Sequence, residues 1–225
     1  MSASNRLGRL VPLAGVGFAV LTIAGYLTIG PFPDSDASVS ELTSFYAVNH
    51  SHVAAGGQLL GLAAIFFALF GTAVWARIRS SDLHPVVAGT ALVGTAMAAV
   101  SWLDGAGAYS VLGEIGHQRW LAPAALQAVQ VGGSVGGIDG GTIIFLLAVA
   151  TAGIAGHAFP RWLALPALAL AIVYLTPFGY FASLLVLPWA AVTGIVMAVR
   201  PAAGVPATTG VAAPAVGGGP ALTSR

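Results

Sequence analysis

Long apolar runs separated by short polar segments dominate the first half of the chain. Three of these runs cover residues 10–30, 53–76 and 86–103. A helix rises about 1.5 Å per residue, so about 20 apolar residues cross the roughly 30 Å hydrocarbon core of a bilayer. The pattern therefore predicts three membrane-spanning helices with these bounds.

Two later apolar runs are each too long for one crossing. The first predicts an outer pre-helix over 121–131 and a spanning helix over 138–158. The second contains Pro177-Phe178-Gly179 near its middle, a triplet typical of a turn, and it predicts two spans over 162–176 and 180–199. A single kinked helix over this last stretch is the alternative.

The positions of the charged residues favour six spans over five. With six spans, seven of the eight arginines lie on one side of the membrane and only Arg119 lies on the other. Basic residues gather on the cytoplasmic side, so both termini are expected in the cytoplasm. The seven are Arg6, Arg9, Arg77, Arg79, Arg161, Arg200 and Arg225, while the outer acids are Asp34, Asp36, Glu41, Asp104, Glu114 and Asp139, with only Asp82 inside.

Composition agrees with this topology. Of the 225 residues, 57% are hydrophobic and 7% are charged, against about 25% charged in a soluble protein. The chain has no Cys and no Lys, which excludes thiolate nucleophiles, Cys-ligated metals and lysine Schiff bases. The predicted fold is an all-α, polytopic bundle of six transmembrane helices over 1–200, in the cell membrane. Residues 201–225, rich in Ala, Gly and Pro, are expected to be disordered.

The segment after the first span carries a helix-start signal. Ser38 followed by Glu41 matches a capping box and predicts a short helix over 39–50. Its apolar residues recur at helical spacing, so this helix is expected at the membrane interface with its apolar face down. A ledge packed on the bundle is favoured over a lid that gates a ligand.

Four residues in two outer segments have the chemistry of metal ligands. Glu114 and His117 are spaced to share one face of a helix, as in di-metal carboxylate bundles. His50 and His52 lie in the other outer segment and could add nitrogen ligands for zinc or another divalent ion. Solvated loop side chains are the alternative interpretation.

Glycines at intervals of four predict close helix packing. Such stripes let a neighbouring backbone approach within a membrane, although an irregular segment lining a cavity is an alternative. The candidates are Gly132, Gly136 and Gly140, then Gly133, Gly137 and Gly141, and the shorter pair Gly57 and Gly61.

Two acids are candidates for an outward cavity. Ionisable groups at membrane depth are costly and therefore suggest function. Asp104 and Asp139, with Gln127, Gln130 and Tyr109, could form an acidic vestibule. The alternatives are that Asp139 caps the following helix through the amide of Gly141 or Thr142, and that Asp104 marks the water boundary.

The order of these features resembles a family of uncharacterised six-helix integral membrane proteins of actinobacteria. The resemblance rests on Pro33-Asp34-Ser35-Asp36-Ala37-Ser38 leading into Glu41-Leu42-Thr43-Ser44-Phe45-Tyr46, on residues 55–68 before Arg77-Ile78-Arg79, and on Phe159-Pro160-Arg161-Trp162-Leu163 before a final hairpin. It covers most of residues 10–200. It implies a six-helix membrane fold and carries no activity and no catalytic residue.

These features favour a non-enzymatic membrane component. Its expected contacts are the lipid bilayer and, through the glycine-rich faces, a second copy or another membrane protein. A small transporter or channel-like protein with the acidic vestibule is the second hypothesis, and an outer-face metal-dependent enzyme is the third. No catalytic residue, cofactor or nucleic-acid partner is predicted.

Overall fold

The described part of the chain is all-helical. The computed structural model describes residues 10–31, 33, 37–115 and 139–200. Six α-helices lie within them, and this confirms the predicted all-α class. A 3-10 turn, η1 (Val11–Leu13), precedes α2 (Ala14–Ile29), and the others are α3 (Val39–Arg79), α4 (Pro85–Ile115), α6 (Gly140–Ile154), α7 (Arg161–Tyr174) and α8 (Gly179–Val199).

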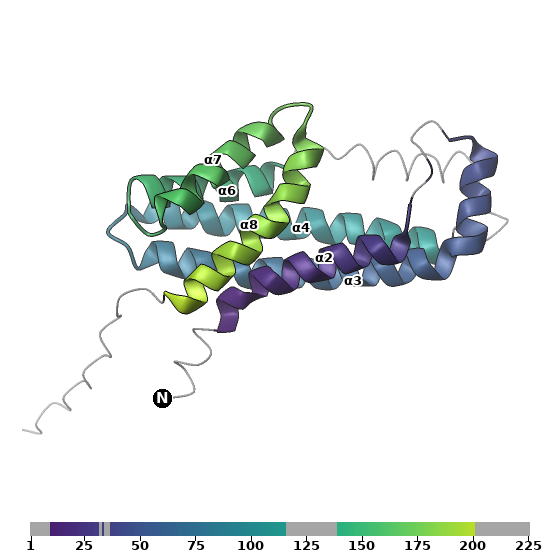
Figure 1. The fold of residues 1–225 in the computed structure, drawn as a ribbon, viewed down its shortest axis with the longest axis horizontal. Helices are drawn as coiled ribbons and strands as arrows, with labels where there is room; N and C mark the ends of the chain where they lie inside the picture. The colour runs from purple at the N-terminus through teal and green to yellow at the C-terminus, as the bar shows by residue number, and fades with distance from the viewer. Residues whose placement is uncertain (1–9, 32, 34–36, 116–138, 201–225) are drawn as a thin grey trace, which may run out of the picture.

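The six helices form a closed ring of neighbours. Each helix packs on the next one described along the chain, and α8 returns to pack on α2 and η1. Figure 1 shows α2, α3 and α4 running along the long axis, α6 and α7 stacked beside one part of α4, and α8 crossing obliquely back to the start of α2.

Four of the helical segments are long and apolar enough to cross a membrane. They are Val11–Ile29, Val39–Arg79, Pro85–Glu114 and Phe181–Val199. The remaining two, α6 and α7, are apolar but have 15 and 14 residues, so each is only about 21 to 22 Å long. The structure therefore supports a multi-pass membrane protein.

The predicted break between 39–50 and 53–76 is wrong, because α3 is one continuous helix of 41 residues. The polar run Asn49-His50-Ser51-His52 suggested the break. These residues have only modestly lower helix propensity than alanine, and no Pro or Gly accompanies them. Figure 1 shows the chain changing direction here, since the first turns of α3 stand steeply to its long remainder.

The predicted helix over 86–103 is also too short, because α4 continues to Ile115. Asp104 and its two neighbouring glycines do not end it, and the first twelve residues of the expected polar loop 104–119 are helical. Each glycine costs about 1 kcal/mol of helix propensity. Contacts of this half of α4 with α3 offset that cost, since Ala106 and Leu112 are buried there.

The second half of the chain follows its predicted boundaries more closely. Two helices, α7 and α8, occupy the stretch that could have been one kinked helix, and the turn between them covers residues 175–178. The helix expected over 138–158 is shorter, because it begins at Gly140 and ends at Ile154. His157 beyond it has a φ of +54°, which turns the chain toward α7. The expected pre-helix 121–131 and tail 201–225 lie outside the described residues.

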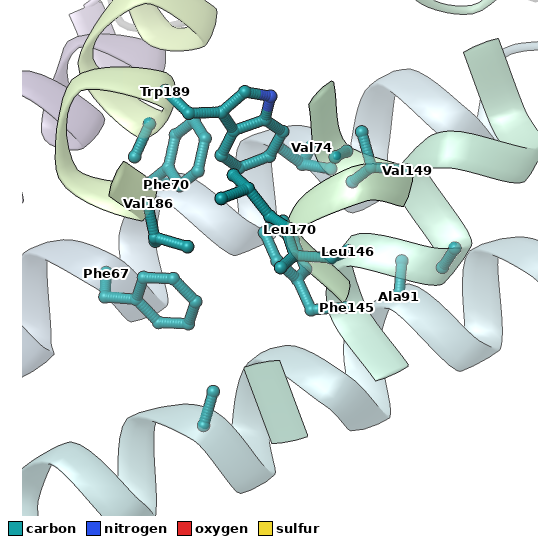
Figure 2. Packing of buried hydrophobic residues seen from close by; sticks show 14 of the residues in the cluster. Phe67, Phe70, Val74, Ala91, Phe145, Leu146, Val149, Leu170, Val186 and Trp189 are labelled. Carbon is teal, nitrogen blue, oxygen red and sulfur yellow. The ribbon is translucent and has the colours of Figure 1, made fainter. Parts of the chain in front are cut away.

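An aromatic core fills the centre of the ring. Phe67 and Phe70 of α3, Phe145 of α6 and Trp189 of α8 meet with centroid separations of 5.5 to 6.4 Å. Figure 2 shows these rings with the aliphatic side chains around them. The indole of Trp189 also donates to the Leu163 carbonyl at 3.1 Å, which joins α8 to α7 inside the core.

Candidate functional site

The bundle has two chemically different ends. We call the end where α3 and α8 finish and where α6 turns into α7 the arginine end, because all four described arginines, Arg77, Arg79, Arg161 and Arg200, belong to these segments. We call the opposite end, where α2 finishes and α3 begins, the distal end. Figure 1 shows α3 and α4 extending beyond the other helices toward the distal end.

A second hydrophobic cluster, separate from the aromatic core, holds the distal end together. Its buried members come from α2, α3 and α4. Tyr46 is fully buried, and Phe45 and Tyr109 pack around it. We call this group the distal cluster; its buried residues are Ile29, Leu42, Tyr46, Val53, Leu60, Ala106 and Leu112.

The capping box that opens α3 is confirmed. The amide of Ser38 donates to Oε2 of Glu41 at 2.7 Å, and the amide of Glu41 donates to Oγ of Ser38 at 3.3 Å. These bonds start the helix so that Leu42 and Tyr46 face the distal cluster. The apolar face of 39–50 therefore meets protein at these residues, as expected for a ledge on the bundle.

Three of the four metal-ligand candidates, His50, His52 and Glu114, lie on helices that pair at the distal end. Gly113 of α4 lies against the backbone of Ala54 in α3, so Glu114 is near the level of His52. Both of these side chains are exposed, and His50 is partly buried. Among the described residues no group of three or more His, Asp or Glu could hold a metal ion. His117 lies outside them, so the Glu114–His117 pair stays a prediction.

The described residues of the expected acidic vestibule have different surroundings. Tyr109 packs on the distal cluster, and Asp104 is exposed on α4. Asp139 caps α6, because one carboxylate oxygen accepts from the Thr142 amide at 3.1 Å and the other accepts from the Thr142 hydroxyl. Gln127 and Gln130 lie outside the described residues, so a vestibule that includes them stays a prediction.

A polar group near Asp139 was not anticipated from the sequence. Tyr174, at the end of α7, interacts with the Ser183 hydroxyl of α8 and electrostatically with Asp139 and Tyr26. Three segments, α2, the N-cap of α6 and α8, thus contribute polar side chains around one buried tyrosine. The sequence feature that could have indicated this contact is Ser183, whose hydroxyl lies one turn into α8, the helix that follows Tyr174.

Arg77 joins three segments at the arginine end. Its Nε donates to the Ala158 carbonyl and its Nη1 to the Arg200 carbonyl, both at 2.7 Å. Its guanidinium carbon lies 5.5 Å from the centroid of the Phe159 ring. One half-buried side chain therefore connects the end of α3 to the α6–α7 loop and to the end of α8.

The described glycine candidates differ in how closely they are packed. A Cβ added to Gly57 would lie 2.6 Å from the Ser110 amide nitrogen, and one added to Gly141 would lie 2.6 Å from the Met97 carbonyl carbon. Gly61 has room for a methyl group, and Gly140 has nothing within 4 Å. The other candidates, Gly132, Gly133, Gly136 and Gly137, lie outside the described residues.

Neighbouring helix backbones also approach closely at glycines outside the predicted four-residue stripes. Gly94 lies against the Phe145 backbone between α4 and α6, and Gly25 and Gly56 face each other between α2 and α3. At Gly15 a Cβ would lie 2.5 Å from the Ala190 carbonyl oxygen, where α8 closes the ring on α2. The glycines therefore permit backbone contact at most of the helix interfaces in the ring.

Comparison of the chain with protein-family models, with curated proteins and with solved structures gives no match.

Proposed function

We propose that the chain is a six-span protein of the cell membrane with its arginine end in the cytoplasm. Its distal end forms an extramembrane arm that binds a second copy or another membrane component. The observation that carries this proposal is the length of the central pair. Beyond the bend in α3, its residues 53–79 and the 31 residues of α4 are about 40 and 46 Å long, while a bilayer core is about 30 Å thick.

The charges support this orientation. The four described arginines share the arginine end, with Asp82 as the acid nearby in the α3–α4 loop. Glu41 and Glu114 belong to the distal end. Arginines gather on the cytoplasmic side of membrane proteins, so the surplus length of α3 and α4 projects on the outer side.

Connectivity supports six crossings even though α6 and α7 are short. Helix α8 is long enough to cross and it ends at the arginine end, so its first residue Gly179 belongs on the outer side. Arg161 begins α7 beside the segment bound to Arg77, and Tyr174 ends α7 beside the start of α8. Helix α7 must therefore cross back, and α6 crosses before it, in a locally thin bilayer.

Single cysteines in the Cys-free chain test this topology. We expect an impermeant thiol reagent to label Ser44→Cys and Thr176→Cys in intact cells, since both positions are exposed and on the proposed outer side. Ser80→Cys and Ser224→Cys should react only after permeabilisation. Labelling of Ser80→Cys in intact cells would contradict the orientation. If only Thr176→Cys stayed unlabelled, α7 and α8 would not cross the membrane and four crossings would remain.

The arm also offers an apolar surface for a partner. Val48 is 78% exposed on the part of α3 that projects farthest, and Val111 of α4 is 51% exposed. A short bis-maleimide applied to membranes should cross-link Val48→Cys into a larger species, whereas the control Ser80→Cys should stay monomeric. Absence of any larger species for Val48→Cys would contradict the partner-binding role.

A further inference from the structure

The contacts of Arg77 hold the segments of the other described arginines at one end of the bundle. Its bonds to the Ala158 and Arg200 carbonyls hold the α6–α7 loop and the end of α8 against the end of α3. Arg161 lies three residues beyond Ala158, and Arg79 lies two residues beyond Arg77. Three further described arginines therefore belong to the same end of the bundle as the one that serves the fold.

These three arginines are exposed, and none has an ion pair with a carboxylate among the described residues. Arg79 stacks on Trp75, with its guanidinium carbon 5.4 Å from the ring centroid. Arg161 precedes Trp162, whose side chain is 54% exposed. The other titratable groups described at this end are Asp82, His84 and His157, so positive charge is in excess.

Exposed tryptophan beside arginine is the arrangement found at the membrane–water boundary. The indole lies at headgroup level, and a guanidinium above it can donate two parallel hydrogen bonds to a phosphate. The cytoplasmic leaflet is rich in anionic lipid, which attracts each nearby arginine by about 1 kcal/mol. The positive charge of the arginines and the headgroup depth of the tryptophans thus both favour anionic phospholipid as the ligand.

We infer that Arg79 and Arg161, with Trp75 and Trp162, form a binding surface for anionic phospholipid headgroups of the inner leaflet. This inference rests on the proposed orientation of the arginine end. Arg77 is a positioning residue here, because its bonds are to backbone carbonyls and it holds the helix ends together. The surface selects lipid by the net negative charge of the headgroup.

The test titrates the full-length purified protein in a neutral detergent with short-chain phosphatidylglycerol, and follows thermal unfolding and native mass spectra. Phosphatidylglycerol should raise the unfolding temperature more than phosphatidylcholine does, and added salt should reduce the difference. The double variant Arg79→Gln/Arg161→Gln should bind phosphatidylglycerol roughly 25-fold more weakly, about fivefold for each arginine removed.

Two controls make the result specific. Arg119→Gln removes the one arginine predicted on the other side and should leave phosphatidylglycerol binding unchanged, while Asp82→Asn should not weaken it. Equal stabilisation by the two lipids, or full binding by the double variant, would overturn the inference. So would inorganic phosphate that matches phosphatidylglycerol at equal concentration, because a free anion would then be the ligand.

The failure of the inference can be told apart from failure of the proposed orientation. Cysteine labelling reports the side of the membrane, while the lipid titration in detergent does not depend on it. If labelling places the arginine end outside and the double variant still loses lipid binding, then the headgroup surface stands and its leaflet is wrong.

Discussion

Two adjacent glycines at the start of α6 have opposite environments. A Cβ on Gly141 would overlap the backbone of Met97 and Ala98, whereas a Cβ on Gly140 would meet nothing within 4 Å. Both residues belong to the predicted stripes, so their sequence spacing does not distinguish them. The difference comes from the side of α6 that faces α4.

We expect Gly141→Ala to destabilise the protein by about 1–3 kcal/mol, because α4 must move away from α6. Gly140→Ala is the matched control. It should be neutral or stabilising by up to about 1 kcal/mol, since alanine is the better helix former. Unfolding of both variants in one detergent measures the difference, and equal stabilities would mean that the α4–α6 contact is looser than described.

The N-cap of α6 gives a second prediction at the scale of one residue. Asp139 accepts from the amide of Thr142 through one oxygen and from its hydroxyl through the other. The single amide oxygen of asparagine can still accept from the Thr142 amide without charge, and its nitrogen can donate to the hydroxyl oxygen. Asp139→Asn should therefore keep most of the stability, and Asp139→Leu should lose roughly 1 kcal/mol or more. Thermal unfolding of the two variants checks this. A Leu variant as stable as the native protein would contradict the capping role.

At the scale of the element, the start of α3 depends on the capping box. The Ser38 amide and then the Ser38 hydroxyl lower the pKa of the fully exposed Glu41 below its ordinary value of 4.5. Because the pKa is lower in the folded segment, ionised Glu41 favours the folded state above pH 4.5. That contribution is lost as the pH falls through the lower, folded-state value.

The chain has only two glutamates, Glu41 and Glu114, so ¹³C-labelled glutamate gives two carboxyl signals for this test. We expect Ser38→Ala to move the pKa of Glu41 upward and to lower the stability of the first turn of α3 by about 1 kcal/mol, as measured by hydrogen exchange. The Glu114 signal is the internal control. An unchanged titration of Glu41 would mean that the capping box does not form in solution.

The two long helices also show why local signals misplace helix ends. Asn49 to His52 in α3 and Asp104, Gly105 and Gly107 in α4 are weak helix formers, yet both stretches are helical. Their propensities differ from alanine by at most about 1 kcal/mol per residue. Where α3 and α4 pack on each other, burial of Val53, Leu60 and Leu112 outweighs differences of that size.

At the scale of the whole molecule, Arg77 links helices that are far apart in the sequence. Ala158 and Arg200 lie 81 and 123 residues beyond it. Arg77→Gln should lower the free energy of unfolding by about 2–4 kcal/mol, because two charge-assisted hydrogen bonds are lost. Arg79→Gln is the matched control and should change it by at most about 0.5 kcal/mol.

Thermal unfolding of the full chain in detergent measures both variants. Because Arg77 connects the end of α3 to the α6–α7 loop and to the end of α8, its loss should also increase proteolysis of the α6–α7 loop. Native-like stability of Arg77→Gln would contradict the connecting role at this end.

The sequence by itself determined the properties that depend only on a few neighbouring residues or on composition. The 57% hydrophobic content and the apolar run lengths determine a helical membrane class. The Ser38–Glu41 pair, the Asp139 cap and the turn around Pro177 act through bonds and backbone limits that span a few residues. Their geometry therefore agrees with the expectation drawn from the residues alone.

Only the tertiary structure decided how far α3 and α4 extend, which glycines face a neighbouring backbone and which polar residues surround Tyr174. Each depends on contacts between helices that are distant in the chain. A glycine next to another backbone and a glycine next to open space have the same local sequence, as Gly141 and Gly140 show. The energy of such contacts exceeds helix propensity, so packing sets the ends and the partners of these helices.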